Sequence, residues 1–122
     1  MINQPLALVI EDDWDLSTIF AEALKAAGFE AEVIRDGGQA VHHLQATVPS
    51  VVILDLHLPT VSGADLLEQI RADERLTNTR ILVTTADARM AEILEEKADL
   101  VLVKPISFSQ LRDLAKRLAQ SS

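Results

Sequence analysis

Apolar residues along the chain follow two alternating patterns. Short continuous apolar runs are typical of buried strands, and they occupy residues 6–10, 32–34, 51–54, 81–84 and 100–103. Between these runs, apolar residues recur at steps of three and four, which predicts amphipathic helices near 14–27, 40–44, 63–70, 90–94 and 108–118. Strands that are apolar throughout and alternate with helices predict an α/β fold with a parallel sheet covered on both faces.

Residues that favour helix ends support these boundaries. Asp12 or Asp13 is placed to cap the first helix, which Gly28 ends. The glycines at 37–38 bound the second helix on its N-terminal side, and Ser107 starts a capping box for the last helix. No repeat, low-complexity tract or linker interrupts the pattern, so we expect a single domain over residues 1–122.

Polar residues with chemical potential stand where four of the predicted strands end. Glu11 and Asp12 follow the first strand, Asp55 the third, Thr85 the fourth and Lys104 the fifth. The carboxyl ends of parallel strands meet at one edge of a sheet, where open α/β folds place their ligand sites. An unpaired carboxylate loses several kcal/mol of hydration when it is buried. The pattern therefore predicts a functional site and not a set of unrelated turns.

The residue types at this edge are suited to phosphoryl chemistry. A carboxylate is a weak nucleophile towards a phosphoryl group, because both carry negative charge. Three clustered carboxylates form the all-oxygen site that Mg²⁺ accepts, and Mn²⁺ is a possible substitute. A lysine ammonium and a threonine hydroxyl then supply the remaining contacts to phosphoryl oxygens. We therefore expect Asp55 to act with a bound divalent cation.

Composition excludes several other classes. The formal net charge is −8, which argues against direct nucleic-acid binding, because that binding depends on clustered Lys and Arg. The chain has no cysteine, so a disulfide framework and a thiolate metal site are excluded, as fits a reducing cytosol. Its apolar runs fall far short of the roughly 20 residues that a membrane-spanning helix needs. A cytoplasmic protein without membrane attachment is expected.

Four motifs in order give the chain a family resemblance. They are Glu11-Asp12, the segment 55–59 (Asp-Leu-His-Leu-Pro) with Gly63 behind it, Thr85-Ala86 and Lys104-Pro105. In these motifs the chain resembles the receiver domain of two-component response regulators along essentially its whole length. The resemblance implies a doubly wound, flavodoxin-like fold with strand order 2-1-3-4-5 and a cis peptide bond before Pro105.

The resemblance also implies a role for each matching residue. Asp55 is then the acceptor of a phosphoryl group from a histidine kinase or a phosphotransfer protein, and the chain is a signalling domain, not an enzyme beyond its own phosphorylation and dephosphorylation. The other implied roles are metal binding by Glu11, Asp12 and the His57 backbone carbonyl, and phosphoryl contacts by Thr85 and Lys104. An output domain or a homodimer partner would use the face formed by the fourth helix, fifth strand and fifth helix.

The sequence departs from the family pattern on that face. Val101 stands where an aromatic residue commonly moves inward on phosphorylation, and Lys97 stands where glycine is common. Lys104 follows Thr85 by 19 positions, about one helical turn fewer than the resemblance leads us to expect. We therefore expect a short fourth helix and a small structural response to phosphorylation.

Two residues that flank the site also have an implied role. The resemblance implies that His57 and Asp87 control how water reaches the phosphoryl group.

A pseudo-receiver, which binds partners without phosphorylation, would normally have lost part of the acidic, Asp and Lys set, and this chain has kept it. An aspartyl-phosphate phosphatase requires a second acid where His57 stands. The adjacent His42 and His43 point about 100° apart on a helix and are interpreted as surface residues.

Overall fold

The computed structural model describes residues 4–94 and 96–120. Its five strands form one parallel sheet. The strand order is β2-β1-β3-β4-β5, as the family resemblance implies. The strands are β1 (Leu6–Ile10), β2 (Glu30–Ile34), β3 (Val51–Asp55), β4 (Arg80–Thr85) and β5 (Leu100–Val103). Residues 1–3, 95 and 121–122, which the predicted domain includes, lie outside the described residues.

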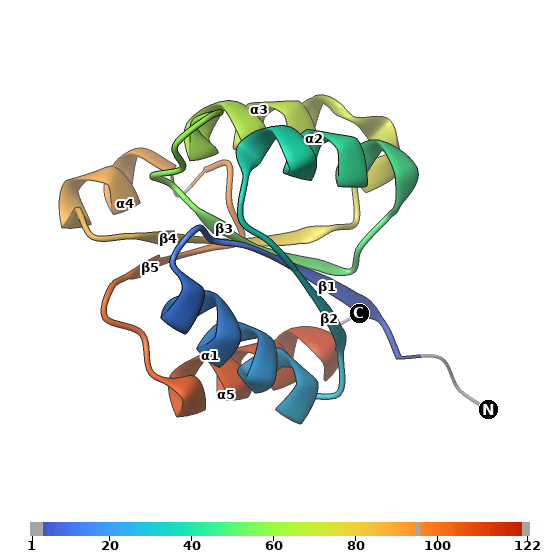
Figure 1. The fold of residues 1–122 in the computed structure, drawn as a ribbon, viewed down its shortest axis with the longest axis vertical. Helices are drawn as coiled ribbons and strands as arrows, with labels where there is room; N and C mark the ends of the chain where they lie inside the picture. Colours follow the sequence, from blue (N-terminus) through green and yellow to red (C-terminus); the bar gives the residue numbers. More distant parts are fainter. Residues whose placement is uncertain (1–3, 95, 121–122) are drawn as a thin grey trace.

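Helices cover the sheet on both faces. Figure 1 shows α1 (Trp14–Ala26) and α5 (Phe108–Gln120) on one side, and α2 (Gly37–Ala46) and α3 (Gly63–Ala72) on the other. The short α4 (Ala88–Leu94) lies beyond the end of the α2 and α3 layer. This three-layer arrangement confirms the predicted doubly wound α/β fold. In the part of the chain that the structure describes, no helix has the length and apolar character that a bilayer crossing requires.

Successive residues of the central strands point alternately into two separate apolar clusters, one on each face of the sheet. Leu8 and Val52 point to the cluster that contains the buried side chains of α2 and α3. Val9 and Ile53 point to the opposite cluster, against α1 and α5. Because successive side chains of a strand leave on opposite faces, a central strand with apolar layers on both sides must be apolar at nearly every position. This explains why the runs in β1 and β3 are continuous.

Local capping fixes where the helices begin. The Asp13 side chain accepts a hydrogen bond from the Leu16 N–H (2.9 Å), and the Ser107 hydroxyl accepts one from the Gln110 N–H (3.0 Å). Of the two predicted candidates Asp13 therefore caps α1, and the predicted cap of α5 by Ser107 is confirmed. Gly28 follows α1 with φ = +99°, a conformation that side chains other than glycine rarely adopt.

Some boundaries differ from those predicted. β2 begins at Glu30, two residues before the predicted start, because backbone pairing with β1 extends over residues that are partly exposed at the sheet edge. The glycines at 37–38 lie inside the first turn of α2 and do not bound it, since Asp36 supplies the cap. A short 3₁₀ helix at Glu74–Leu76, capped by Asp73, was not predicted.

Gly63 brings the start of α3 into contact with the backbone that follows Asp55. A Cβ atom on Gly63 would lie 2.4 Å from the Asp55 carbonyl oxygen and 2.5 Å from the Leu56 Cα. The Gly63 N–H also donates to the Leu56 carbonyl (3.0 Å). A side chain at position 63 would therefore displace the loop that leaves the predicted phosphorylation site.

We predict that Gly63→Ala destabilises the fold by about 1–3 kcal/mol, because the added methyl group meets fixed backbone and not a flexible side chain. Urea denaturation measures the change. Gly38→Ala is the matched control, since its Cβ would meet no backbone and only the end of the Asp36 side chain, at 3.1 Å. Equal stability of the two variants would contradict the proposed close contact.

Candidate functional site

Asp55 and Glu11 end adjacent central strands and are both buried. Asp55 is the last residue of β3 and is 4% exposed, while Glu11 directly follows β1 and is 1% exposed. The Glu11 N–H donates to the Ile34 carbonyl (3.1 Å), which extends the pairing of β1 and β2 by one residue. The sheet therefore fixes the backbone beneath both carboxylates.

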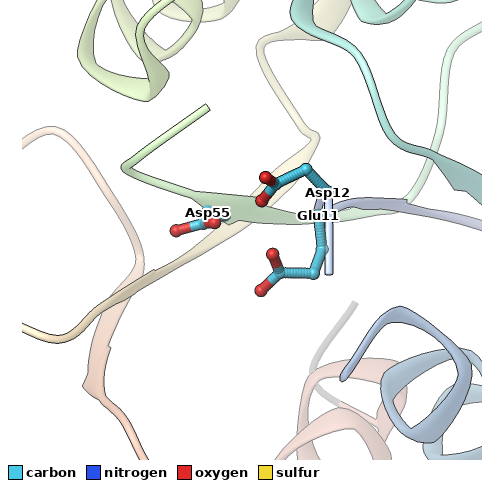
Figure 2. A group of neighbouring side chains, drawn as sticks. All are labelled: Glu11, Asp12 and Asp55. Atoms are coloured by element: carbon cyan, nitrogen blue, oxygen red, sulfur yellow. The ribbon is translucent and has the colours of Figure 1, made fainter. Parts of the chain in front are cut away.

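Asp12 completes a cluster of three carboxylates. Figure 2 shows the side chains of Glu11, Asp12 and Asp55 next to one another at the ends of β1 and β3. One oxygen from each lies within 4.8 Å of the other two, and Asp12 is exposed while the other two are buried. Such a set of oxygen donors, open to solvent on one side, suits a hard divalent cation that keeps part of its water shell. The cluster predicted from the sequence is thus present.

Lys104 supplies positive charge to the two buried acids. Its ammonium donates to Glu11 Oε1 (2.8 Å) and lies 3.5 Å from Asp55 Oδ1. The Lys104 N–H donates to the Thr85 carbonyl (2.7 Å), and the following peptide bond to Pro105 is cis, as the resemblance implies. Lys104 is therefore held by both backbone and side chain at the edge of the cluster.

The burial of opposite charges shifts two pKa values. Burial raises the pKa of the Glu11 carboxyl and outweighs the opposing effect of the hydrogen bond from Lys104. Burial by itself would lower the pKa of Lys104, but the hydrogen bond to Glu11 and the attraction of Asp55 outweigh burial, and the net pKa is raised. Lys104 alone therefore does not fully offset the cost of burying the charged carboxylates. A second cation bound at the cluster would offset more of that cost.

Hydrogen bonds hold the loop after Asp55 both at its start and farther along the chain. The His57 N–H donates to Asp55 Oδ1 (3.1 Å), and the Leu56 N–H donates to the Thr84 carbonyl (2.9 Å). Farther along, the Thr60 hydroxyl donates to Asp36 Oδ2 (3.1 Å) at the start of α2. The loop thus holds the Asp55 carboxylate through a backbone amide, while the predicted metal contact through the His57 carbonyl stays a prediction.

Thr85 lies next to the cluster but its side chain has another partner. Thr85 is the last residue of β4, is fully buried, and its hydroxyl accepts a hydrogen bond from the Asp87 N–H (3.1 Å). Its position alternates with that of Thr84, which pairs with Asp55 across the sheet. The structure therefore brings together Glu11, Asp12, Asp55 and Lys104, while the predicted phosphoryl contact of the Thr85 hydroxyl stays a prediction.

An arginine that the sequence analysis did not consider binds Asp87. The Arg89 guanidinium donates to both carboxylate oxygens of Asp87 (3.2 and 3.1 Å), and the Arg89 N–H donates to Oδ1 (2.9 Å). These hydrogen bonds, with a smaller contribution from the nearby His57, lower the pKa of Asp87. The spacing Asp87-x-Arg89 was the available signal in the sequence.

A second unpredicted contact borders the site at the start of α1. The guanidinium of Arg35 lies 3.4 Å from the centroid of the Trp14 ring and donates to the Ser17 hydroxyl (3.1 Å). Trp14 is 70% exposed, and it is two residues from Asp12. His42 and His43 are exposed, which confirms their interpretation as surface residues.

Comparison with known families and proteins agrees with this geometry. Residues 7–116 match the model of the response regulator receiver domain. The chain is 36% identical over 94% of its length to a putative transcriptional regulator of Haloferax volcanii, and covers 19% of that protein. It is 37% identical over 85% of its length to the sensory transduction protein RegX3 of Mycolicibacterium smegmatis, and covers 46% of it. The chain thus spans half or less of these two relatives.

Solved structures show the same fold. A CheY-like receiver domain from Methylobacillus flagellatus superposes with a TM-score of 0.84 at 26% identity, with 95% of this chain and 99% of that one covered. The response regulator TrrA of Thermotoga maritima, solved in complex with Mg²⁺ and BeF, superposes with a TM-score of 0.82 at 26% identity, with 93% and 98% covered. With the fold, the acidic cluster and the family match in agreement, the chain belongs to the response regulator receiver domain family.

Proposed function

We propose that Asp55 accepts a phosphoryl group from the phosphohistidine of a histidine kinase or a phosphotransfer protein. The observation that carries this proposal is the burial of Asp55 beside Lys104 and two further acids, at the carboxyl edge of the sheet. In the transfer, an oxygen of Asp55 bonds to phosphorus as the bond from phosphorus to the imidazole nitrogen breaks. The product is an acyl phosphate, and the imidazole leaves on the partner.

The residues of the site fit a Mg²⁺ ion, with Mn²⁺ as a substitute. Glu11, Asp12 and Asp55 would hold it through carboxylate oxygens and His57 through its carbonyl, and a bound cation neutralises charge on the transferring group. Lys104 is placed to pair with a phosphoryl oxygen, since its ammonium already reaches Asp55. The Mg²⁺ and BeF complex of TrrA, a related receiver, supports this assignment.

We further propose that the domain acts in the cytoplasm and passes its signal to an output. The relatives are named as transcriptional regulators and sensory transduction proteins, and they are longer than the matched region. An output domain or a second copy would bind the face of α4, β5 and α5. The chemistry of the domain itself would be limited to its own phosphorylation and dephosphorylation.

The first prediction from the proposed function concerns the acceptor. Asp55→Asn removes the nucleophilic carboxylate while keeping the volume and the hydrogen bond from the His57 N–H, so we expect no phosphorylation by acetyl phosphate with Mg²⁺. Intact mass spectrometry measures the gain of one phosphoryl group in the wild-type protein. The control is Asp65→Asn, an acid in the first turn of α3. A phosphorylated Asp55→Asn variant would refute the assignment.

The second prediction concerns the metal and pH. We expect Mg²⁺ at roughly ten to a hundred times its dissociation constant to add about 1.4–2.7 kcal/mol to the free energy of unfolding. Because the pKa of Glu11 is raised above its usual 4.5, the Mg²⁺-free fold should gain stability as pH falls from neutral through the folded pKa towards 4.5.

Denaturation with and without Mg²⁺ between pH 4.5 and 7 tests both points. Glu11→Gln serves as the comparison, since it cannot titrate. The free energy of wild type minus that of Glu11→Gln should rise as pH falls without Mg²⁺. An absence of Mg²⁺ stabilisation in the wild-type protein would count against the site.

The third prediction concerns the lifetime of the acyl phosphate. If His57 and Asp87 orient attacking water, His57→Ala and Asp87→Ala should each change the dephosphorylation rate several-fold. Arg89→Ala should change it as well, because Arg89 occupies both oxygens of Asp87. Release of phosphate from the phosphorylated protein gives the rates. Unchanged rates in all three variants would exclude this control of hydrolysis.

A further inference from the structure

One buried hydroxyl beside the acidic site lacks a hydrogen bond. Thr84 is 1% exposed, and its Oγ1 atom has no hydrogen-bond partner among the residues that the structure describes. Thr79 shows the usual arrangement, because it is equally buried and its hydroxyl donates to the Pro49 carbonyl (2.7 Å). Burying a hydroxyl without a partner costs free energy, and such groups are rare in folded proteins. The hydroxyl of Thr84 therefore needs an explanation.

Thr84 faces the same side of the sheet as Asp55. The two residues are register partners on β4 and β3. The residues two positions before them, Leu82 and Ile53, both belong to the apolar cluster against α1 and α5. Neighbouring strands lie about 4.8 Å apart, so the side chains of Thr84 and Asp55 leave the sheet side by side. Thr85 points to the opposite face, because side chains alternate along a strand.

The Lys104 side chain has to cross β4 at the level of Thr84. Lys104 directly follows β5, and its ammonium reaches Glu11 after β1 and Asp55 at the end of β3. In the sheet, β4 lies between β5 and β3. Because Thr84 is the β4 residue in register with Asp55, Lys104 passes over the face that carries the Thr84 hydroxyl. A donor with three N–H groups and an unused acceptor thus share one face of the sheet.

Lys104 is bound to an acid that the predicted metal ion also requires. Both oxygens of Glu11 have partners: Oε1 accepts from the Lys104 ammonium (2.8 Å), and Oε2 accepts from the Asp13 N–H (3.2 Å). Binding of a divalent cation by Glu11, Asp12 and Asp55 would draw on these oxygens, and the two positive charges would repel each other. The ammonium then needs another acceptor on the same face.

We propose that Thr84 is a positioning residue whose hydroxyl accepts a hydrogen bond from the Lys104 ammonium when a divalent cation occupies the acidic cluster. This inference rests on the proposed function. The hydroxyl keeps the ammonium beside Asp55, where it can pair with a phosphoryl oxygen, and leaves Glu11 free to bind the cation. The cost of burying the hydroxyl without a partner is recovered when Lys104 moves to it.

Thermal denaturation without Mg²⁺ is the first test. Thr84→Val removes the hydroxyl and keeps the shape of the side chain, so the melting temperature should stay the same or rise, by up to roughly 5 °C. Thr79→Val is the matched control, and its melting temperature should fall, because it loses the hydrogen bond to the Pro49 carbonyl. A similar fall in both variants would mean that the Thr84 hydroxyl is already bonded without the cation, and would overturn the proposal.

Calorimetric titration with Mg²⁺ is the second test. Thr84→Val should weaken Mg²⁺ binding roughly three- to tenfold, since Lys104 loses its alternative acceptor. Thr84→Ser keeps the hydroxyl and should bind Mg²⁺ nearly as well as the wild type. In a Lys104→Met background Thr84→Val should have no further effect, because the hydroxyl acts through the ammonium. Wild-type affinity in Thr84→Val, or an equal loss in the Lys104→Met background, would contradict the assigned role.

Phosphorylation by acetyl phosphate separates this inference from the proposed function. At saturating Mg²⁺, Thr84→Val should gain the phosphoryl group several-fold more slowly than the wild type, and the rate of Thr84→Ser should be closer to that of the wild type. An unchanged rate in Thr84→Val would count against the positioning role. Failure of the proposed function would look different, because the wild-type protein would then gain no phosphoryl group, and the Mg²⁺ affinities would still decide the role of Thr84.

Discussion

The burial of Glu11 and Asp55 against one lysine is the constraint on which the rest of this structure depends. Two carboxylates that are almost fully removed from water repel each other, and each loses hydration that only a partner can replace. Lys104 provides one positive charge for both, and it reaches them from β5, across β4. The parallel sheet is what brings residues 11, 55 and 104 to one place, so the stability of the fold and the chemistry of the site share the same contacts.

In this arrangement the negative charges of the site outnumber the positive ones. The residues that carry them are also held rigidly. The backbone ladders of β1 and β3 fix the carboxylates from below, and the loop after Asp55 is held by Gly63 on one side and by the pair of Thr60 and Asp36 on the other. Rigid acids cannot separate to relieve their repulsion. A bound divalent cation would supply the compensation that local movement does not, and the three carboxylates offer the oxygen ligands for it.

The sequence was sufficient for features that depend on position along a strand. Continuous apolar runs identified β1, β3, β4 and β5, and the polar residue that follows each run identified the site edge, because strand ends in a parallel sheet converge. It was insufficient where side chains distant in sequence decide. The pairing of Arg71 with Asp99 joins residues 28 positions apart, and no local pattern indicates it. The length of β2 was underestimated because an edge strand needs apolar residues at fewer positions. The second helix was predicted, but the glycines at 37–38 concealed its true start, which Asp36 caps.

The residues of the acidic site and the departures from the family pattern lie in different parts of the fold. Asp55 ends β3 and Glu11 directly follows β1, and both of these strands are packed from both faces, while Lys104 directly follows the edge strand β5. The departures from the family pattern, at Val101 and Lys97, lie around α4 and β5, and Lys97 has acquired a partner of its own in Glu68. Thr85 stands at the junction, with its carbonyl bound to the Lys104 N–H and its hydroxyl to the Asp87 N–H. Thr85 therefore contacts both the acidic site, through Lys104, and the turn that begins α4, through Asp87.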